Sequence, residues 1–465
     1  MTNGAEFIRR ELMIRMVRAF DEGNLEKTID RIPIDIRPRH GEFSRSSVWH
    51  DRAVLKYRVM ALLGYSCEEE TDEARTLSSY LTEMRKAPPA PTNPLTVCSA
   101  GCDGCRPRTF MVTDNCRGCF SRPCEFNCPK HAIRVSDQHS HIDNTLCVKC
   151  GKCAQVCPYH AIVEVTVPCE EACPVGAIRK NEFGVAQIDF KRCIFCGACF
   201  RSCPFSAIVE KSQLIQLLYA LRDQEKTGEH YTAIVAPAAI SQFPGSIEQL
   251  FTAIKKLGFG EIIEVALGAD MTTEHEAHEF VEFQKEGRGL MTTSCCPAWV
   301  NLVKKHFPNF LSHVSTTPSP MVYAAGLAKE LNPKTKVVFI GPCIAKRDEA
   351  LAKENVDYVL SFEELGAIFS ARKIDPVLLE PLKLPTPASD NGRNYAKSCG
   401  VTKAVLDEIA DELPPDFKLD SKFIDGLDRK AVGMIRLYAM GKLPANFLEV
   451  MACKGGCQNG PCSLH

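Results

Sequence analysis

The segment CVKCGKCAQVCP at residues 147–158 recurs as CIFCGACFRSCP at residues 193–204. In both segments the cysteines follow the pattern C-x2-C-x2-C-x3-C-P, with Gly151 and Gly197 between them. Thiolates spaced in this way along a tight loop can reach successive irons of one cube, and glycine lets the backbone close around it. The two segments therefore predict a pair of 4Fe–4S clusters, around which this part of the chain folds.

The ligand sets follow from a rule for such paired runs, in which three cysteines bind one cluster and the fourth cysteine binds the other. The rule predicts two sets: Cys147, Cys150, Cys153 and Cys203 for one cluster, and Cys193, Cys196, Cys199 and Cys157 for the other. A C-x2-C pair alone would also suit zinc, but the full run of four cysteines favours a cubane.

The element C-P-x-x-A-I recurs along this region, beginning at Cys128, Cys157, Cys173 and Cys203. A stretched run, C-x2-C-x4-C-x3-C-P, stands upstream and consists of Cys116, Cys119, Cys124 and Cys128. Its first three cysteines predict a third cluster, with Cys173 or Cys128 as the fourth ligand.

Five further cysteines precede or interrupt these runs. Cys169 and Cys173, in PCEEACP, resemble the second half of a run whose first half is missing. Cys98, Cys102 and Cys105, in CSAGCDGC, are candidate ligands of a fourth cluster. We therefore expect three to four 4Fe–4S clusters in this region.

The composition argues against several classes of protein. A disulfide scaffold is the alternative reading of 25 cysteines, but it suits short chains with signal peptides, and the opening MTNGAEFIRRELMIRM is charged throughout. The net charge of −1 gives no reason to expect a nucleic-acid or membrane partner. The sequence contains no apolar stretch of about 18 residues. We expect a cytoplasmic protein from an anaerobic organism.

Three regions follow one another along the chain. Residues 1–96 have apolar positions at helical spacing and end in the proline-rich linker APPAPTNP, residues 87–94. Residues 97–212 are the ferredoxin-like cluster region. Residues 213–465 alternate apolar runs with helical segments, which predicts an α/β domain with mainly parallel sheets. The predicted strands are residues 231–236, 261–267, 290–293, 336–340 and 358–362.

Four cysteines of the α/β region stand in three separate segments: TSCCPAW (residues 293–299), GPCIAKR (residues 341–347) and EVMACKGGC (residues 449–457). Thiolates from three dispersed loops could hold one more cubane deep in a domain. These segments resemble, in order and spacing, the three signature motifs of FeFe (iron-only) hydrogenases. The likeness covers about residues 100–465 and is greatest to the monomeric, ferredoxin-dependent group B branch.

The resemblance implies an H-cluster, a 4Fe–4S cubane joined to a di-iron site that carries CO, CN and azadithiolate. It implies Cys296, Cys343, Cys453 and Cys457 as cubane ligands, with Cys457 bridging to the di-iron site. It implies the catalytic group Cys295, Lys346, Glu276, Glu279 and Ser315, in which Lys346 binds a cyanide and the others carry protons. Glu276 and Glu279 also stand three apart on a predicted helix, hence on one face.

The resemblance further implies cofactor contacts from Pro237, Gly341, Ala345 and Met451. Two of these positions depart from the family pattern, which has Met where Gly341 stands and Ser where Ala345 stands. We expect Met321 to refill the space that Gly341 leaves open.

The function implied is the reversible reduction of protons to dihydrogen. Ferredoxin or a similar small carrier would supply electrons, and maturation proteins would insert the di-iron site. Two alternatives stay open: a sensory or low-activity hydrogenase-like protein, and an iron–sulfur assembly protein. The assembly proteins resemble TSAC where this chain has TSCC, so Cys295 argues against the second alternative.

Overall fold

The computed structural model describes residues 4–89, 92–409 and 419–464. The chain begins with five helices, which are α1 (Gly4–Asp21), α2 (Leu25–Thr28), α3 (Ile32–Ile36), α4 (Val48–Leu62) and α5 (Leu77–Lys86). The predicted linker follows them, but its residues Ala90 and Pro91 lie outside the described residues. The predicted domain boundaries after residues 96 and 212 stay a prediction.

Helix α1 packs its apolar face against the C-terminal part of the chain. Leu12 and Met16 have no exposed surface and belong to a hydrophobic core that continues into the C-terminal domain. The main partner of α1 is α16 (Phe362–Arg372). The Arg9 guanidinium donates a hydrogen bond of 2.7 Å to the buried carboxylate of Glu363. The N-terminal helices and the C-terminal domain therefore share one core.

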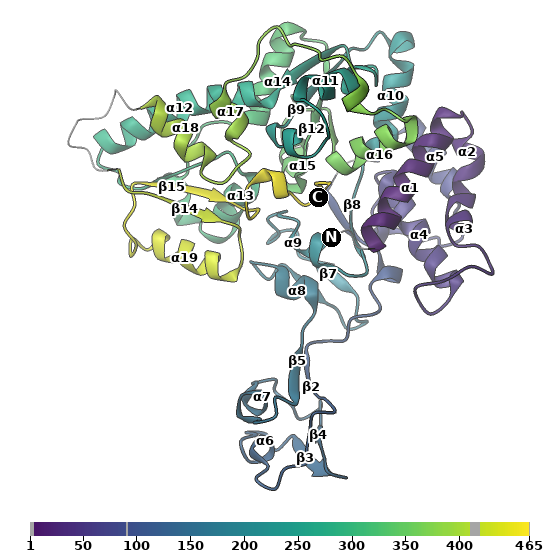
Figure 1. Ribbon diagram of the computed structural model, residues 1–465, viewed down its shortest axis with the longest axis vertical. Helices are drawn as coiled ribbons and strands as arrows, with labels where there is room; N and C mark the ends of the chain where they lie inside the picture. Colours follow the sequence, from purple (N-terminus) through teal and green to yellow (C-terminus); the bar gives the residue numbers. More distant parts are fainter. Residues whose placement is uncertain (1–3, 90–91, 410–418, 465) are drawn as a thin grey trace.

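The cysteine-rich region forms two small lobes (Figure 1). The proximal lobe, residues 95–105 and 167–210, contains β1 (Leu95–Val97), α8 (Pro168–Ala172), β6 (Ile178–Lys180), β7 (Ala186–Ile188), α9 (Ala198–Ser202) and β8 (Ile208–Glu210). The distal lobe, residues 106–166, contains β2 (Thr109–Val112), α6 (Pro123–Phe126), β3 (Ile133–Ser136), β4 (His139–Ile142), α7 (Lys152–Val156) and β5 (Ile162–Val165). Figure 1 shows the distal lobe projecting from the body of the molecule at the β2–β5 pair.

The C-terminal domain contains two parallel sheets. The first has the strand order β10-β9-β12-β13 and the second β11-β15-β14. The strands are β9 (Tyr231–Val235), β10 (Glu261–Glu264), β11 (Met291–Thr292), β12 (Lys336–Ile340), β13 (Tyr358–Leu360), β14 (Ser421–Asp425) and β15 (Phe447–Met451). Every residue of β9 and β15 is buried, as expected for strands covered on both faces.

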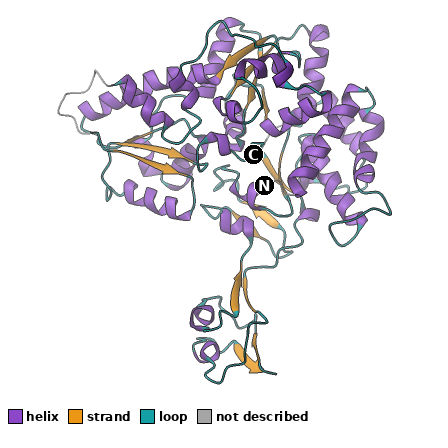
Figure 2. Ribbon diagram, viewed as in Figure 1, coloured by secondary structure: helices purple, strands orange, loops and turns teal. Residues whose placement is uncertain are grey.

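Helices lie on either side of both sheets (Figure 2). They are α10 (Leu214–Thr227), α11 (Ile247–Lys255), α12 (Val265–Lys285), α13 (Pro297–His306), α14 (Pro320–Leu331), α15 (Ile344–Leu351), α16, α17 (Asp390–Asn394), α18 (Gly400–Glu408) and α19 (Arg429–Ala439). Helix α12 contains the predicted helical segment with Glu276 and Glu279. Among the described residues, no helix is long and apolar enough to cross a membrane.

The α/β fold with mainly parallel sheets, predicted from apolar runs, is confirmed. Each predicted strand segment contains a strand. The sequence did not predict β14 and β15, or that β11 joins them in a second sheet. Strand β14 exposes Lys422 and Phe423 and therefore lacks a continuous apolar run. Strand β15 has five buried residues but overlaps the EVMACKGGC segment. We interpreted that segment as a ligand motif and predicted no strand there.

Candidate functional site

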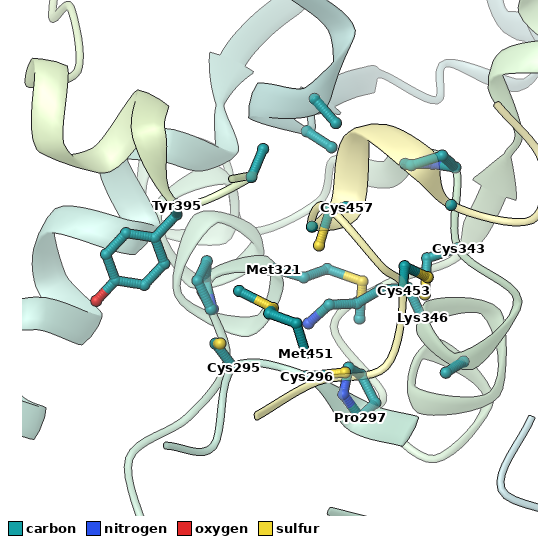
Figure 3. Close-up of a pocket in the computed structure, with 18 of the residues that line it drawn as sticks. Cys295, Cys296, Pro297, Met321, Cys343, Lys346, Tyr395, Met451, Cys453 and Cys457 are labelled. Carbon is teal, nitrogen blue, oxygen red and sulfur yellow. The ribbon is translucent and has the colours of Figure 1, made fainter. Parts of the chain in front are cut away.

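Four cysteines that follow strands of the two parallel sheets surround one cavity (Figure 3). Strand β11 leads to Cys296, β12 to Cys343, and β15 to Cys453 and Cys457. All four cysteines line one cavity. Parallel sheets of this kind bind ligands beyond the carboxyl ends of their strands. The structure thus brings together the four thiols that the sequence scatters over three segments.

Local backbone structure fixes two of these thiols at helix starts. Cys296 is the N-cap residue of α13, where Pro297 follows it, and Cys343 is the N-cap residue of α15. Burial raises the pKa of Cys343 to about 11 and the pKa of Cys457 to about 12, so both are protonated near neutral pH when no cation is present. A coordinated metal centre supplies the positive charge that deprotonates such thiols. Four buried thiols around one cavity therefore fit a cubane.

The remaining walls of the cavity are mainly apolar. Four of the residues that form them are Pro237, Met321, Ala345 and Met451. Met321 and Ala345 have no exposed surface. An apolar wall disfavours water next to whatever occupies the cavity.

Gly341, expected among the cofactor contacts, does not line the cavity. A Cβ atom at Gly341 would stand 2.5 Å from a ring carbon of Phe339 and 3.2 Å from the Cβ of Ala236. The ring of Phe339 thus fills the space beside Gly341, for which we expected Met321. The expectation was wrong because it considered only the position that replaces the family's Met and not the strand residue two places earlier.

Of the lysines that the structure describes, Lys346 alone lines the cavity. Its Nζ donates hydrogen bonds of 2.7 Å to Ser319 Oγ and 2.7 Å to Glu349 Oε2. Burial lowers the pKa of Lys346, but the ion pair with Glu349 outweighs it and leaves the pKa raised. Lys346 is therefore a fixed cation that can bind an anionic ligand.

The predicted proton carriers lie together beside Cys295. Ser315 Oγ donates a hydrogen bond of 2.6 Å to Glu279 Oε2, and the Ser294 N–H donates one of 3.0 Å to Glu276 Oε1. Glu276 has no exposed surface and its Oε2 has no hydrogen-bond partner among the described residues. Burial raises the pKa of Glu276 to about 8, although the hydrogen bond from the Ser294 N–H opposes the shift.

Cys295 lines the cavity at the inner end of this group. Burial raises the pKa of Cys295 well above its ordinary value, and the neighbouring carboxyl of Glu276 raises it further. At the other end, Glu279 is partly exposed and accepts hydrogen bonds from the Thr316 N–H and hydroxyl. A set of exchangeable protons thus lies between the surface and the cavity.

The cysteines of the two lobes are grouped differently from the spacing rule. One small cavity in the distal lobe is lined by Cys116, Cys119, Cys124 and Cys157. Cys157 therefore does not lie with Cys193, and the fourth thiol beside the stretched run is neither Cys173 nor Cys128. The rule of three cysteines plus one still holds in this lobe, but we applied it to the two most similar runs, which belong to different lobes. Within the described ranges, no three His, Cys, Asp or Glu side chains lie close enough to hold a single metal ion.

Comparison with known proteins decides the family. The profile of the iron-only hydrogenase large subunit, C-terminal domain, matches residues 229–461, just over half of the chain. The chain belongs to the iron-only hydrogenase family. Two further profiles match the lobes of this iron-only hydrogenase homologue, a 4Fe–4S binding domain at residues 140–163 and a 4Fe–4S dicluster domain at residues 167–207.

Relatives in curated collections include hydrogenases and assembly factors. Iron hydrogenase 1 of Clostridium pasteurianum is 28% identical over 71% of this chain and 66% of its own length. The periplasmic [Fe] hydrogenase large subunit of Nitratidesulfovibrio vulgaris is 30% identical over 46% of this chain and 61% of its own length. A probable cytosolic Fe–S cluster assembly factor of Nematostella vectensis is 26% identical over 45% of this chain and 60% of its own length.

The chain thus spans about two thirds or less of the length of these relatives. Among solved structures, an apo [FeFe]-hydrogenase from Chlamydomonas reinhardtii matches with a TM-score of 0.46 and 22% identity, over 54% of this chain and 84% of that one.

Three residues of the site were missed by the sequence analysis. Phe339 lines the cavity, and Glu349 holds Lys346 in place. Tyr395 also lines the cavity, and its hydroxyl lies 2.7 Å from Thr273 Oγ1. The spacing of Lys346 and Glu349, i and i+3 on one helix, was a usable signal for that ion pair. Tyr395 stands in no motif, and only the fold brings it to the site.

Proposed function

We propose that this iron-only hydrogenase homologue catalyses the reversible reduction of protons to dihydrogen at an H-cluster. The observation that supports it best is the free thiol of Cys295, which lines the cavity next to the ligand candidate Cys296 and beside the buried carboxyl of Glu276. A protein that only stores or transfers clusters has no use for a proton carrier at this position. Dihydrogen formation needs one, because two protons and two electrons must meet at one site.

The cofactor would be held by the four cavity thiols, Cys296, Cys343, Cys453 and Cys457. When bound, the H-cluster supplies low-potential electrons and an iron site at which the H–H bond is made or broken. Lys346 would bind the cyanide of this group, since it is the cation that reaches the cavity. Pro237, Met321, Ala345 and Met451 would pack around it and exclude water.

The residues of the chain deliver the protons. Glu279 is partly exposed and takes a proton from solvent. The Ser315 N–H donates a hydrogen bond of 2.8 Å to Thr292 O, which fixes the position of this residue. The Ser315 hydroxyl, which is hydrogen-bonded to Glu279, relays the proton inward to Glu276. The pKa of Glu276, about 8, lies near neutral pH, so this carboxyl can both accept and release a proton. Glu276 passes the proton to Cys295.

The partners and location belong to the same proposal. A ferredoxin or similar small carrier supplies the electrons, maturation proteins insert the di-iron site, and the protein works in the cytoplasm of an anaerobic organism. The segment GPCIAKR, with Gly341 and Ala345 in place of Met and Ser, supports the ferredoxin-dependent group B branch.

Infrared spectroscopy tests the proposal directly. The chain is produced anaerobically with the maturation proteins, and dihydrogen evolution is assayed with reduced ferredoxin. We expect carbonyl and cyanide bands together with dihydrogen. Cubane absorption without these bands would overturn the proposal and favour an assembly role, whereas bands with negligible turnover would favour a sensory protein.

A further inference from the structure

The two lobes contain the same elements in the same order. An antiparallel strand pair closes each lobe, β1–β8 in the proximal lobe and β2–β5 in the distal lobe. A hairpin follows the first C-P element of each lobe, β6–β7 after Cys173 and β3–β4 after Cys128. A short helix follows glycine in each second run, α9 after Gly197 and α7 after Gly151, both glycines having positive φ.

The hydrogen bonds that the cysteine sulfurs accept from the backbone also occur at matching positions in the two lobes. The cysteine of each C-P element accepts a bond from the N–H four residues later, at 3.2–3.3 Å in Cys128, Cys157, Cys173 and Cys203. The first cysteine of the second run accepts one from the N–H two residues later, at 3.4 Å in both Cys147 and Cys193. The backbone therefore wraps these cysteines identically in the two lobes.

The correspondence between the lobes also identifies the first two cysteines of the incomplete run that ends in Cys169 and Cys173. In the distal lobe, Cys116 accepts a 3.4 Å hydrogen bond from Ser140 N on β4. In the proximal lobe, the thiol that accepts the matching bond, 3.3 Å from Ala186 N on β7, is Cys102. Cys102 and Cys105 thus correspond to Cys116 and Cys119.

The helices complete the correspondence. Cys124 is the second residue of α6 and Cys169 the second residue of α8, and each follows a proline. Helix α6 packs on α7, and α8 packs on α9. Cys169 packs in the same side-chain cluster as Cys102, Cys105 and Cys203.

We propose that residues 106–166 are a complete two-cluster ferredoxin module inserted into a second such module, between Cys105 and Cys169. The four ligand sets are then Cys116, Cys119, Cys124 and Cys157; Cys128, Cys147, Cys150 and Cys153; Cys102, Cys105, Cys169 and Cys203; and Cys173, Cys193, Cys196 and Cys199. Together they use every cysteine between Cys98 and Cys203 except Cys98 itself.

Cys98 is excluded as a ligand by its position. Its N–H donates to Ala207 O at 2.7 Å, and in the distal lobe the matching bond, also 2.7 Å, runs from Thr113 N to Ala161 O. Because Thr113 has no sulfur, the distal lobe has no ligand at this position, and the matching residue Cys98 is not needed as a ligand in the proximal lobe. Cys98 has no exposed surface and packs with Cys67 and Val209 in a small apolar cluster.

The insertion of one module into the other sets the order in which electrons would pass through the clusters. Cys196 lines the cavity that holds Cys296 and Cys343, so the set containing Cys196 is adjacent to the catalytic cubane. The inserted module lies at the far end, where it projects from the body (Figure 1). Electrons from a soluble carrier therefore enter at the distal lobe and cross the proximal lobe.

Deletion of the inserted module in the full chain tests the proposal. Residues 107–166 are replaced by a short Gly–Ser linker, which suffices because Thr109 and Val165 are paired neighbours. Iron is counted after anaerobic reconstitution without maturation proteins, so the result does not depend on hydrogenase activity. At four irons per cubane, we expect about 20 irons in the parent and about 12 in the deletion variant. About 8 irons or fewer would overturn the proposal, because pairing by spacing takes ligands inside residues 107–166 for the sets of both Cys193 and Cys203, and neither set would stay complete.

Point variants test the ligands one at a time. Cys169→Ala should lose about 4 irons or convert one cluster to a three-iron form with its own electron paramagnetic resonance signal, and Cys98→Ala should lose none. The reverse result would overturn the assignment of these two cysteines. The double variant Cys116→Ala/Cys157→Ala should lose at most the 4 irons of one cluster, and loss of about 8 irons would contradict the shared cluster. Additive loss would place the two residues on different clusters.

Discussion

The side chain of Glu276 has no exposed surface, and its buried carboxyl group makes the stability of the protein depend on pH. Its pKa, raised to about 8 by burial, exceeds that of an unfolded glutamate, so the unfolded state releases the proton first as pH rises. The protein therefore loses stability between about pH 4.5 and pH 8, by about 1.4 kcal/mol for each unit of pH in that window.

Glu276→Gln should remove this loss. Denaturant unfolding at pH 5 and pH 8 should show the variant gaining stability relative to the parent as pH rises, and Glu279→Gln serves as the control because Glu279 is partly exposed. An unchanged difference between the two pH values would mean that Glu276 ionises freely in the folded protein.

Cys295 and Cys296 are neighbours in sequence with separate roles. Cys295→Ala should leave the iron content intact, because the four ligand thiols remain, and should lower dihydrogen evolution by about 10² or more through loss of the last proton carrier. Cys399→Ala, which changes a half-buried thiol outside the cavity, should keep parental activity. Parental turnover in Cys295→Ala with full cofactor occupancy would remove Cys295 from the path.

Glu279 is the carrier nearest the solvent. Glu279→Gln keeps the volume of the side chain but cannot titrate, so turnover should fall by about 10² with the iron content unchanged. Glu279→Asp should retain more activity, since the shortened carboxylate still titrates near Ser315. If the Gln and Asp variants turn over equally, protons reach Cys295 by another route.

At the scale of elements, α1 and α16 are joined by a buried ion pair between Arg9 and Glu363. Arg9→Met leaves the buried carboxylate without its main partner and should lower the free energy of unfolding by about 3–5 kcal/mol. Arg15→Met, which breaks only the half-exposed pair with Glu11, should cost less than about 1 kcal/mol. Equal melting temperatures for the two variants would show that the α1–α16 contact contributes little.

Elements also show what the sequence could and could not predict. Continuous apolar runs predict β9, β10, β12 and β13, because strands buried on both faces leave that signal. The cavity thiols were predictable from three motifs that resemble a known family. The ligand pairing was not, because Cys105 and Cys169 are separated by a second module whose own cysteines follow the same pattern. Phe339 and Tyr395 reach the cavity only through packing, for which no local pattern exists.

At the scale of the whole molecule, we expect the distal lobe to be needed by a protein electron donor but not by a small artificial one. The variant that lacks residues 107–166, once matured, should still evolve dihydrogen from a small artificial donor such as reduced methyl viologen, because such a donor can reach the proximal clusters. Evolution driven by reduced ferredoxin should fall by at least about tenfold, because the variant lacks the lobe at which we propose that electrons enter and the two clusters in it. A parallel fall with both donors would indicate that the lobe serves the fold and not electron entry.

The shared core of α1 and the C-terminal domain also has a consequence for biosynthesis. Arg9 and Glu363 are 354 residues apart, so the apolar face of α1 leaves the ribosome long before its partner helix exists. At 5–20 residues per second, the delay is roughly 20–70 s. During that time α1 can pack only against the neighbouring helices α2, α3 and α4, and the surface of α1 that meets α16 stays uncovered. Nascent chains of this protein should therefore depend on chaperones that bind exposed apolar helices, until translation reaches α16 and the first helix can dock.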